Sequence, residues 1–449
     1  MIELKRIKLR SSVIGLHFMN YYSLNRKAPD TNFENAVIKG LAPDRGLYFP
    51  KHIEPLPKSF FEDIDNKSYK EIAYEAITQF VSPEIPEDVL KGIVEDTLSF
   101  DFPVVKLDDH ISTLELFHGP TMAFKDVGAR FMARCLGYFN KNNTNEVTVL
   151  VATSGDTGGA VAHGFLGVKG VNVVILYPSG KVSDIQEKQL TTLGQNITAL
   201  EVDGVFDDCQ DMVKKAFLDE ELTNTMQLTS ANSINVARWL PQLFYFMFAY
   251  KQLHKHHKDI VFSIPSGNFG NICAGMVAQQ LGLPIKHFIA SNNANNVVTE
   301  YLKTELYKPK PSVATISNAM DVGNPSNFIR IREIYKDNFE ALKKNLSSFS
   351  YDDAQTKAAL VEIYQRYDYI ADPHGAVGYL GCKDYLKDHP NAHCVFLETA
   401  HPTKFLDVVE DVIETKVALP EQIQAVIGKE KVATQIASYE DLKAFLLKR

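Results

Sequence analysis

The sequence predicts an α/β protein made of two αβα units with mainly parallel sheets, preceded by an N-terminal cap. Two series of short apolar segments rich in β-branched residues alternate with helical segments, one at about 147–218 and one from about 260 onward. Strands that are apolar along their whole length are typical of parallel sheets covered by helices on both faces. Residues 19–102 lack this alternation and are expected to form the cap.

Four segments are expected along the chain of 449 residues, which is long enough for more than one domain. They are an extension at 1–18 that is expected to be disordered, the cap at 19–102, a first αβα unit at 103–240 and a second αβα unit at 241–449. The first unit would carry a reactive lysine and a substrate loop, and the second a phosphate-binding loop.

Periodicity and turn signals predict the individual elements. The cap is expected to hold helices at 69–81 and 86–98, and a further helix is expected at 125–139. The expected strands of the two units lie at 147–152, 171–177, 197–202, 260–264, 285–290 and 394–397. The expected helices lie at 160–167, 184–193, 207–218, 233–257, 272–281, 324–335, 354–367 and 376–386.

Composition and charge argue against several classes of protein. The 47 basic and 55 acidic residues give a net charge of −8, so nucleic acid is not expected as the main partner. The longest apolar run, 240–250, is too short to cross a bilayer, and no membrane partner is expected. Five cysteines are scattered without a C-x-x-C pair, and no metal-ligand spacing such as H-E-x-x-H occurs. We therefore expect a reducing compartment, by default the cytoplasm, and no metal site.

Lys125 is the first candidate catalytic residue. It follows the apolar pair Ala123 and Phe124 and precedes Asp126, at the expected start of a helix. Partial desolvation of an amine there would lower its pKa and free a nucleophile that forms a Schiff base with a carbonyl group. A solvated surface charge is the ordinary alternative for any single lysine, so the prediction depends on the loops that accompany it.

Two glycine-rich loops follow expected strands and open expected helices. The loop at 265–271 contains Gly267, Asn268, Phe269, Gly270 and Asn271, and its backbone N–H groups could cradle a phosphate at a helix N-terminus. It matches neither the P-loop nor the dinucleotide fingerprint, and a tight turn without a ligand is the alternative.

The second loop, at 153–160, contains Ser154, Gly155, Thr157 and Gly158. Its hydroxyl and N–H groups would suit a substrate carboxylate or phosphate. Thr399, at the end of another expected strand, could present a hydroxyl to a ring nitrogen. Helix capping alone is the alternative for each of these features.

Together these blocks resemble the threonine synthase family, which belongs to the pyridoxal-phosphate enzymes with a tryptophan synthase β-subunit-like fold. The resemblance covers nearly the whole chain from Met19 onward. The blocks that carry it lie at 20–23, 40–48, 118–132, 153–160, 265–275, 317–323 and 399–405.

The resemblance implies a role for each candidate residue. Lys125 would bind pyridoxal 5′-phosphate as a Schiff base, the loop from Gly267 to Asn271 would hold the cofactor phosphate, and Thr399 would hydrogen-bond the pyridine nitrogen. The loop from Ser154 to Gly158 would grip the amino-acid substrate. Many relatives in the wider superfamily have an asparagine at the position of Asp156, where it contacts the cofactor 3′-oxygen; a carboxylate would repel an ionised phenolate, so Asp156 is not assigned to the cofactor.

The implied reaction is the conversion of O-phospho-L-homoserine and water to L-threonine and phosphate by a carbon–oxygen lyase, the last step of threonine biosynthesis. Two alternatives remain open: another pyridoxal-phosphate lyase, such as a serine or threonine dehydratase, and a non-catalytic binding protein that resembles threonine synthase. The blocks before Phe102 and the segment 400–405 argue against the first alternative. Retention of Lys125 and both glycine-rich loops argues against the second. The sequence carries no signal for an oligomeric state.

Overall fold

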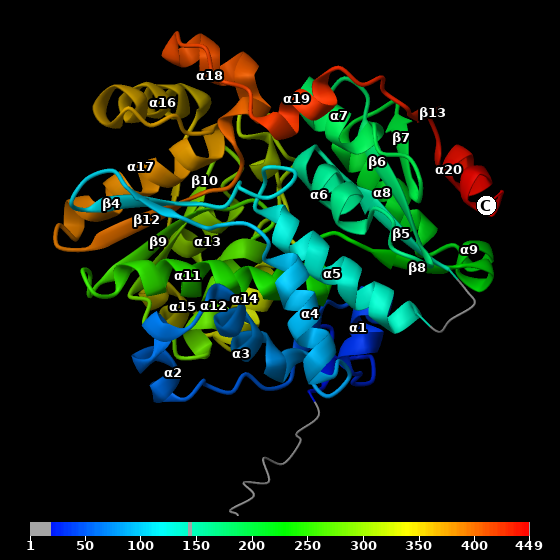
Figure 1. Ribbon diagram of the computed structural model, residues 1–449, viewed down its shortest axis with the longest axis horizontal. Helices are drawn as coiled ribbons and strands as arrows, with labels where there is room; N and C mark the ends of the chain where they lie inside the picture. Colours follow the sequence, from blue (N-terminus) through cyan, green and yellow to red (C-terminus); the bar gives the residue numbers. More distant parts are fainter. Residues whose placement is uncertain (1–18, 142–145, 449) are drawn as a thin grey trace, which may run out of the picture.

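The computed structural model describes residues 19–141 and 146–448, so the expected extension at 1–18 lies outside the described residues. Figure 1 shows two sheets with their helices side by side, and the N-terminal helices gathered below them. Each sheet is dominated by parallel pairing, as the sequence predicts.

The smaller sheet has five strands, all paired in parallel, in the order β13-β7-β6-β5-β8. Its strands are β5 (Val147–Ala152), β6 (Val171–Pro178), β7 (Ile197–Val202), β8 (Gln227–Ser230) and β13 (Thr434–Ile436). Its helices are α5 (Lys125–Asn140), α6 (Asp156–Phe165), α7 (Asp184–Thr191), α8 (Phe206–Ala216), α9 (Glu220–Thr225) and α20 (Tyr439–Leu447).

Alternation along β5 explains why this sheet is covered on both faces. Val149 and Val151 belong to the same apolar cluster as residues of α5 and α6, whereas Leu150 and Ala152 belong to a cluster with α8. Successive side chains of a strand point to opposite faces, so an entirely apolar strand requires helices on both sides.

The larger sheet has six strands in the order β11-β10-β9-β12-β4-β3, and only the β3-β4 pair is antiparallel. Its strands are β3 (Val104–Lys106), β4 (Ile111–Glu115), β9 (Ile260–Pro265), β10 (His287–Asn292), β11 (Leu346–Ser350) and β12 (His393–Glu398). Its helices include α11 (Leu243–Leu253), α12 (Gly270–Gln280), α13 (Val297–Thr304), α14 (Phe328–Ile334), α15 (Phe339–Asn345), α16 (Asp353–Tyr367), α17 (Pro373–Asp388) and α18 (Leu406–Ile413). Helix α19 (Glu421–Ile427) contacts α7 of the smaller sheet.

The sheets do not follow the expected division of the chain at residue 240. Strands β3 and β4 come from the expected first unit but lie in the larger sheet, and β13 comes from the expected second unit but lies in the smaller sheet. The register of β4 shows the reason, because Leu114 pairs with Leu397 of β12, a partner far along the chain that local periodicity cannot reveal.

The N-terminal cap contains a two-stranded antiparallel sheet and several helices. Its elements are β1 (Tyr21–Ser23), α1 (Phe33–Lys39), β2 (Tyr48–Pro50), α2 (Lys58–Glu62), η1 (Ile64–Asn66), α3 (Tyr69–Val81) and α4 (Glu87–Thr97). A capping box formed by Ser68 and Glu71 starts α3 at the expected residue. Helix α3 contacts α11, and α4 contacts α5, so the cap packs on both units.

The expected helix at 233–257 is wrong as a single element. The structure has α10 (Val236–Trp239), the 3₁₀ turn η2 (Leu240–Gln242) and α11 instead. Pro241 lies in η2 and lacks the N–H group that a continuous helix would need. The expected start of a helix at 160 is also wrong, because α6 begins four residues earlier and includes Gly158 and Gly159 in its first turns.

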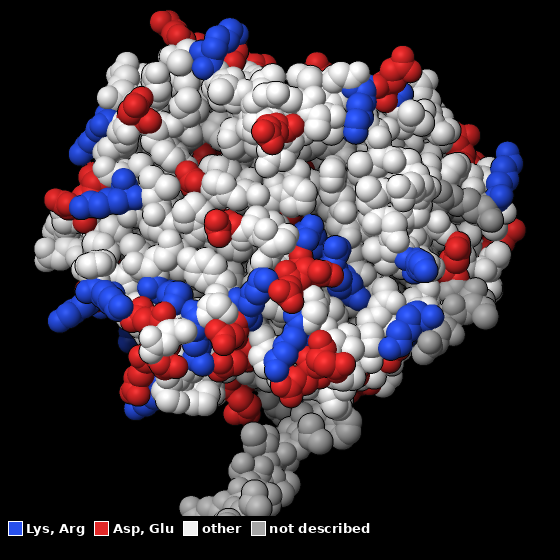
Figure 2. Space-filling model, in the orientation of Figure 1, with Lys and Arg blue, Asp and Glu red and all other residues white. Residues whose placement is uncertain are grey.

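The surface in Figure 2 carries mixed charges rather than a field of one sign. Basic and acidic side chains alternate over the lower half of this face, where α2, α3 and α4 lie. Ion pairs such as Lys70 with Glu95 and Lys91 with Glu87 belong to this region. Among the helices of the described residues, none combines the length and the apolar character needed to cross a membrane.

Candidate active site

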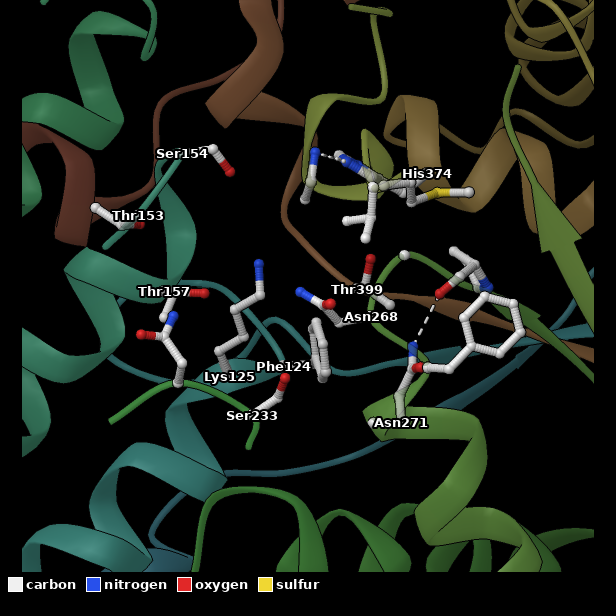
Figure 3. Close-up of a pocket in the computed structure, with 18 of the residues that line it drawn as sticks. Phe124, Lys125, Thr153, Ser154, Thr157, Ser233, Asn268, Asn271, His374 and Thr399 are labelled. Carbon is white, nitrogen blue, oxygen red and sulfur yellow. Dashed lines mark hydrogen bonds between the residues drawn. The ribbon is translucent and has the colours of Figure 1, made fainter. Parts of the chain in front are cut away.

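A pocket with an empty volume of about 870 Å³ opens beyond the carboxyl ends of strands β5, β8, β9 and β12. Such edges of parallel sheets are the usual ligand sites of α/β proteins. Nine residues predicted from the sequence line it: Lys125, Ser154, Thr157, Gly267, Asn268, Phe269, Gly270, Asn271 and Thr399. Figure 3 shows Lys125 between Ser154 and Thr157 on one side and Asn268 and Thr399 on the other.

Lys125 is the first residue of α5, and the turn before it is fixed by Asp126. The Asp126 carboxylate accepts hydrogen bonds from the backbone N–H of Thr121 at 2.9 Å and from its hydroxyl at 2.6 Å. The backbone N–H of Phe124 donates to the carbonyl of Thr399 at 2.9 Å, and Ala123 pairs with Ala400 in an antiparallel bridge. These contacts join the lysine block to the segment that carries Thr399.

The amine of Lys125 is largely removed from solvent, with 16% of the side chain exposed. Burial lowers the pKa of Lys125 below its ordinary value, and the nearby Asp156 carboxylate opposes part of that effect. The positive charges of Lys404 and Arg238 lower the pKa further. An amine in these surroundings loses its proton more readily than a surface lysine does.

Asp156 is a buried carboxylate between two lysines. Its Oδ1 accepts a hydrogen bond from Lys404 Nζ at 2.7 Å, and its Oδ2 lies 3.8 Å from Lys125 Nζ. Burial disfavours the ionised carboxylate, but the charges of Lys404 and Lys125 outweigh burial and hold the pKa of Asp156 well below its ordinary value. The contact with Lys404 was not expected from the sequence.

Within the loop at 153–160, only part of the predicted substrate set reaches the pocket. Ser154 and Thr157 line it, whereas Gly155 and Gly158 are not among the lining residues. The N–H groups of Gly155 and Gly158 donate to the hydroxyl of Thr153, at 3.0 and 2.8 Å. These two groups therefore stabilise the turn and are not free to bind a ligand.

Gly155 has a further structural reason to be a glycine. Its φ of 141° is rarely adopted by residues with a side chain, and a Cβ there would lie 2.5 Å from the side chain of Gln186. The absence of a side chain at Gly155 admits Gln186, whose amide donates to Asp156 at 3.0 Å.

The loop from Gly267 to Asn271 forms a cradle at the N-terminus of α12. Phe269 has the left-handed φ of 61° just before the helix begins, and Asn271 donates from its side chain to the carbonyl of Pro265 at 2.8 Å. A Cβ on Gly267 would lie 2.8 Å from the carbonyl oxygen of Ala319, so a second loop closes over the first. The first N–H groups of a helix have no acceptor within the helix and are available to an anion.

That second loop, which includes η3 (Asn318–Met320), is organised by Asp321. The Asp321 carboxylate accepts hydrogen bonds from Asn293 at 2.8 Å and from the hydroxyl of Thr315 at 2.7 Å. Burial raises the pKa of Asp321 to about 6, against the opposing effect of these hydrogen bonds. The backbone N–H of Ala319 donates to Nε2 of His374 at 3.2 Å, as Figure 3 marks.

Several lining residues were not predicted as site residues: Asn232, Ser233, Arg238, Gln242, Asn318, Asp321 and His374. Arg238 is 3% exposed, and burial lowers its pKa to about 10. Within the described residues, buried polar atoms of Arg238, Gln242 and Asn318 have no hydrogen-bond partner. The polar residues Ser230, Asn232, Ser233 and Asn235 are a usable signal, but the helix expected at 233–257 begins among them and obscures it.

Comparisons with known proteins agree with this geometry. The family model for pyridoxal-phosphate dependent enzymes matches residues 110–399, the model for the threonine synthase N terminus matches residues 20–98, and the model for the threonine synthase C-terminal part matches residues 375–446. A threonine synthase of Buchnera aphidicola subsp. Baizongia pistaciae is 42% identical over 434 residues, which are 96% of this chain and 100% of that protein.

Solved structures give the same result. The crystal structure of threonine synthase from Escherichia coli superposes with a TM-score of 0.90 at 39% identity, and the match covers 96% of this chain and 100% of that one. The structure of threonine synthase from Brucella melitensis with bound pyridoxal phosphate has a TM-score of 0.89 at 32% identity, with 95% and 98% of the two chains covered. The chain therefore belongs to the threonine synthase family of pyridoxal-phosphate-dependent enzymes.

Proposed function

We propose that this protein is a threonine synthase, a carbon–oxygen lyase that converts O-phospho-L-homoserine and water to L-threonine and phosphate. The observation that carries the proposal is the position of Lys125 in the pocket at the carboxyl ends of the strands. Its buried amine lies between a phosphate cradle at Gly267–Asn271 and a hydroxyl-bearing loop at 153–160. This combination provides a nucleophile and two anion sites for a phosphorylated amino acid.

The lining residues fit pyridoxal phosphate. The N–H groups of the Gly267–Asn271 loop and the N-terminus of α12 suit its phosphate, and the Lys125 amine suits its aldehyde carbon. The neutral hydroxyl of Thr399 suits the ring nitrogen. When bound, the cofactor supplies an electron sink that stabilises negative charge at the substrate Cα.

Lys125 is proposed to move protons during the reaction. Because burial lowers its pKa, the Nζ atom is able to accept the proton from Cα and later the proton from Cβ of the substrate. The Asp156 carboxylate, 3.8 Å away, stabilises the ammonium form that results. The lysine thereby alternates between base and acid at one place.

Arg238 is proposed to bind the substrate phosphate, together with Asn232 and Ser233. All three line the pocket. In the part of the chain that the structure describes, the guanidinium of Arg238 donates through Nη1 to the backbone carbonyl of Ala231, and no carboxylate pairs with it. A buried guanidinium without a carboxylate partner favours an anionic ligand, and its planar donors match phosphate oxygens. Ser154 and Thr157 remain for the substrate carboxylate.

We place the reaction in the cytoplasm. All five cysteines are buried free thiols, which suits a reducing compartment.

Product analysis tests the proposed function. The purified protein loaded with pyridoxal phosphate is given O-phospho-L-homoserine, and threonine, phosphate and 2-oxobutyrate are measured over time. We expect threonine and phosphate in equal amounts, and no turnover by the Lys125→Ala variant with its fold intact by circular dichroism. If 2-oxobutyrate is the main product, the protein is a dehydratase; if it takes up no cofactor, it is a binding protein.

A further inference from the structure

An ion pair between Lys404 and Asp156 links the two halves of the molecule at the pocket. Asp156 is the first residue of α6, which follows β5 of the smaller sheet. Lys404 lies in the 3₁₀ turn η4 (Pro402–Phe405), which follows β12 of the larger sheet. Their side chains are 3% and 0% exposed, and Nζ lies 2.7 Å from Oδ1. The pair therefore crosses the joint between the two units in a site that excludes water.

The same carboxylate faces the cofactor lysine. Gln186 donates to Oδ1 at 3.0 Å, so this oxygen has two donors and the orientation of the carboxylate is fixed. The other oxygen, Oδ2, lies 3.8 Å from Lys125 Nζ. Lys404 thus acts on Lys125 through a carboxylate that it holds in place.

Because the Lys404–Asp156 pair is buried, removing either charge should destabilise the protein. Two charges in a dry site are tolerated when they are paired, whereas removal of one partner leaves the other uncompensated. Within the described residues, the carboxylate of Asp156 is the acceptor contacted by Lys404 Nζ. No part of the reaction proposed above uses Lys404, so its burial beside the site calls for a separate explanation.

We propose that Lys404 is a positioning residue for Lys125 and acts through the Asp156 carboxylate. It balances the charge of that carboxylate and turns Oδ2 toward the amine. Lys125 then lies beside a balanced ion pair rather than beside an unpaired negative charge. The inference rests on the proposed function, because it takes Lys125 as the lysine that carries the cofactor.

The charged groups that face Lys125 come from several elements. They are Asp156 at the start of α6, Lys404 in η4, Arg238 in α10 and Asp372 just before α17. Loss of the Lys404 charge leaves the Asp156 carboxylate dominant and favours a proton on the Lys125 nitrogen. Loss of the Asp156 charge leaves Lys404 and Arg238 dominant and disfavours that proton.

A spectroscopic titration tests the inference. The loaded protein is titrated with acid and base, and the pH midpoint of the cofactor colour change reports how strongly the surroundings hold a proton on the Lys125 nitrogen. In Lys404→Met we expect the midpoint to rise by about one pH unit or more, and in Asp156→Asn to fall by a similar amount. The double variant, which removes both charges, is expected to titrate between the two single variants.

Opposite shifts of the two single variants are a signature that loss of packing alone would not produce. Lys443→Met is the matched control, because Lys443 pairs with Asp219 and Glu221 at 2.8 Å each and does not line the pocket. Its midpoint should equal that of the unaltered protein. Lys404→Gln, whose amide can still donate to Asp156, is the second variant if Lys404→Met does not fold, and a rise is again expected.

Unchanged midpoints, or shifts of both single variants in the same direction, would overturn the inference. The outcome is separable from a failure of the proposed function. If the unaltered protein takes up no pyridoxal phosphate or makes no threonine, the proposed function fails. If the unaltered protein is coloured and makes threonine while all variants titrate as it does, only the role of Lys404 fails.

Discussion

Arg238 shows how much a single residue depends on its surroundings. A guanidinium on the surface would be hydrated and paired, but this one is 3% exposed, lines the pocket and has an Nε atom without a hydrogen-bond partner in the described chain. A buried donor that lacks an acceptor is costly unless a ligand supplies one. The proposed binding of the substrate phosphate would supply an acceptor to this guanidinium.

Replacing Arg238 should therefore weaken substrate binding rather than cofactor binding. In Arg238→Gln we expect the KM for O-phospho-L-homoserine to rise by about tenfold to a hundredfold, because hydrogen bonds to charged groups contribute about 1.5–3 kcal/mol. Steady-state kinetics measure the effect, and Arg332→Gln, at a residue with 38% of its side chain exposed, is the control. An unchanged KM, or loss of the cofactor, would contradict this assignment.

His163 makes stability depend on pH. Burial, followed by the charges of Lys404, Lys429 and Arg130, lowers the pKa of His163 from 6.5 to about 4. The unfolded chain binds this proton at higher pH than the folded chain does. The folded protein is therefore favoured fully while His163 is neutral in both states, above the unfolded pKa of 6.5. The free energy of unfolding then decreases as the pH falls from 6.5 toward about 4.

The His163→Phe variant cannot take up this proton. Between about pH 7 and about pH 5 the unaltered protein should lose about 2 kcal/mol more of its free energy of unfolding than the variant does. Guanidinium denaturation at the two pH values gives the difference. Equal losses in the two proteins would show that His163 titrates normally.

Sequence reasoning located the residues of the site that follow strands, but not those that act through distant contacts. Lys125, the loop from Gly267 and Thr399 were predicted because each stands at the end of an apolar run or the start of a helix, and parallel strands bring such ends together. Lys404 lies in the block at 399–405, but the sequence predicts no role for it because its partner Asp156 lies 248 residues away. Arg238 is not predicted, because its burial at the edge of the pocket results from long-range packing.

At the scale of elements, the cradle depends on the close approach of two loops. Gly267 lies against the backbone of Ala319 and Met320, with a Cβ position 2.8 and 2.9 Å from their atoms. Backbone atoms cannot move aside as a flexible side chain can. The shape of the cradle is therefore set jointly by the start of α12 and by the loop that Asp321 holds.

A methyl group at Gly267 should open the cradle. In Gly267→Ala we expect the dissociation constant for pyridoxal phosphate to rise by about tenfold or more, which corresponds to about 1.4 kcal/mol. Absorbance titration of the cofactor-free protein measures it. Gly92→Ala is the matched control, because a Cβ at Gly92 in α4 meets nothing within 4 Å. That control should bind cofactor normally and gain up to about 1 kcal/mol of stability; cofactor affinity as high in Gly267→Ala as in the control would contradict the account.

Uninterrupted elements with a clear apolar pattern match their expected bounds, whereas three-residue strands and interrupted helices do not. The expected bounds of 69–81, 147–152 and 197–202 coincide with α3, β5 and β7. The helix expected at 233–257 failed because the apolar pattern continues through Pro241, although the backbone cannot continue as one helix. Strands such as β3 and β13 have three residues each, too few for a visible pattern.

At the scale of the whole molecule, the chain crosses between the two sheets more than once. Strand β4 belongs to the larger sheet although it precedes every strand of the smaller sheet in the sequence. Strand β13, near the end of the chain, belongs to the smaller sheet. Helix α20 then packs on α8 and α9. The two units expected as consecutive segments are in fact interleaved, because Ile436, Leu442 and Leu446 lie in the apolar cluster of the smaller sheet.

Truncating a buried residue of α20 should therefore destabilise the molecule although it lies far along the chain from the smaller sheet. Leu442 is 0% exposed within the apolar cluster of that sheet, and Leu442→Ala is expected to cost about 2–5 kcal/mol. Leu447→Ala, in the same helix at 38% exposure, should cost less than about 0.5 kcal/mol. Denaturant unfolding compares the two variants. A loss of stability in Leu442→Ala as small as in Leu447→Ala would mean that α20 is not part of the cooperative unit.

The central claim is that the protein breaks a carbon–oxygen bond and adds water at the neighbouring carbon. The most direct test is turnover of O-phospho-L-homoserine in water labelled with heavy oxygen, followed by mass analysis of both products. We predict threonine with the label in its hydroxyl group and phosphate without label, because the bridging oxygen leaves with the phosphate. Labelled phosphate together with homoserine would show cleavage of the phosphorus–oxygen bond and would contradict the account.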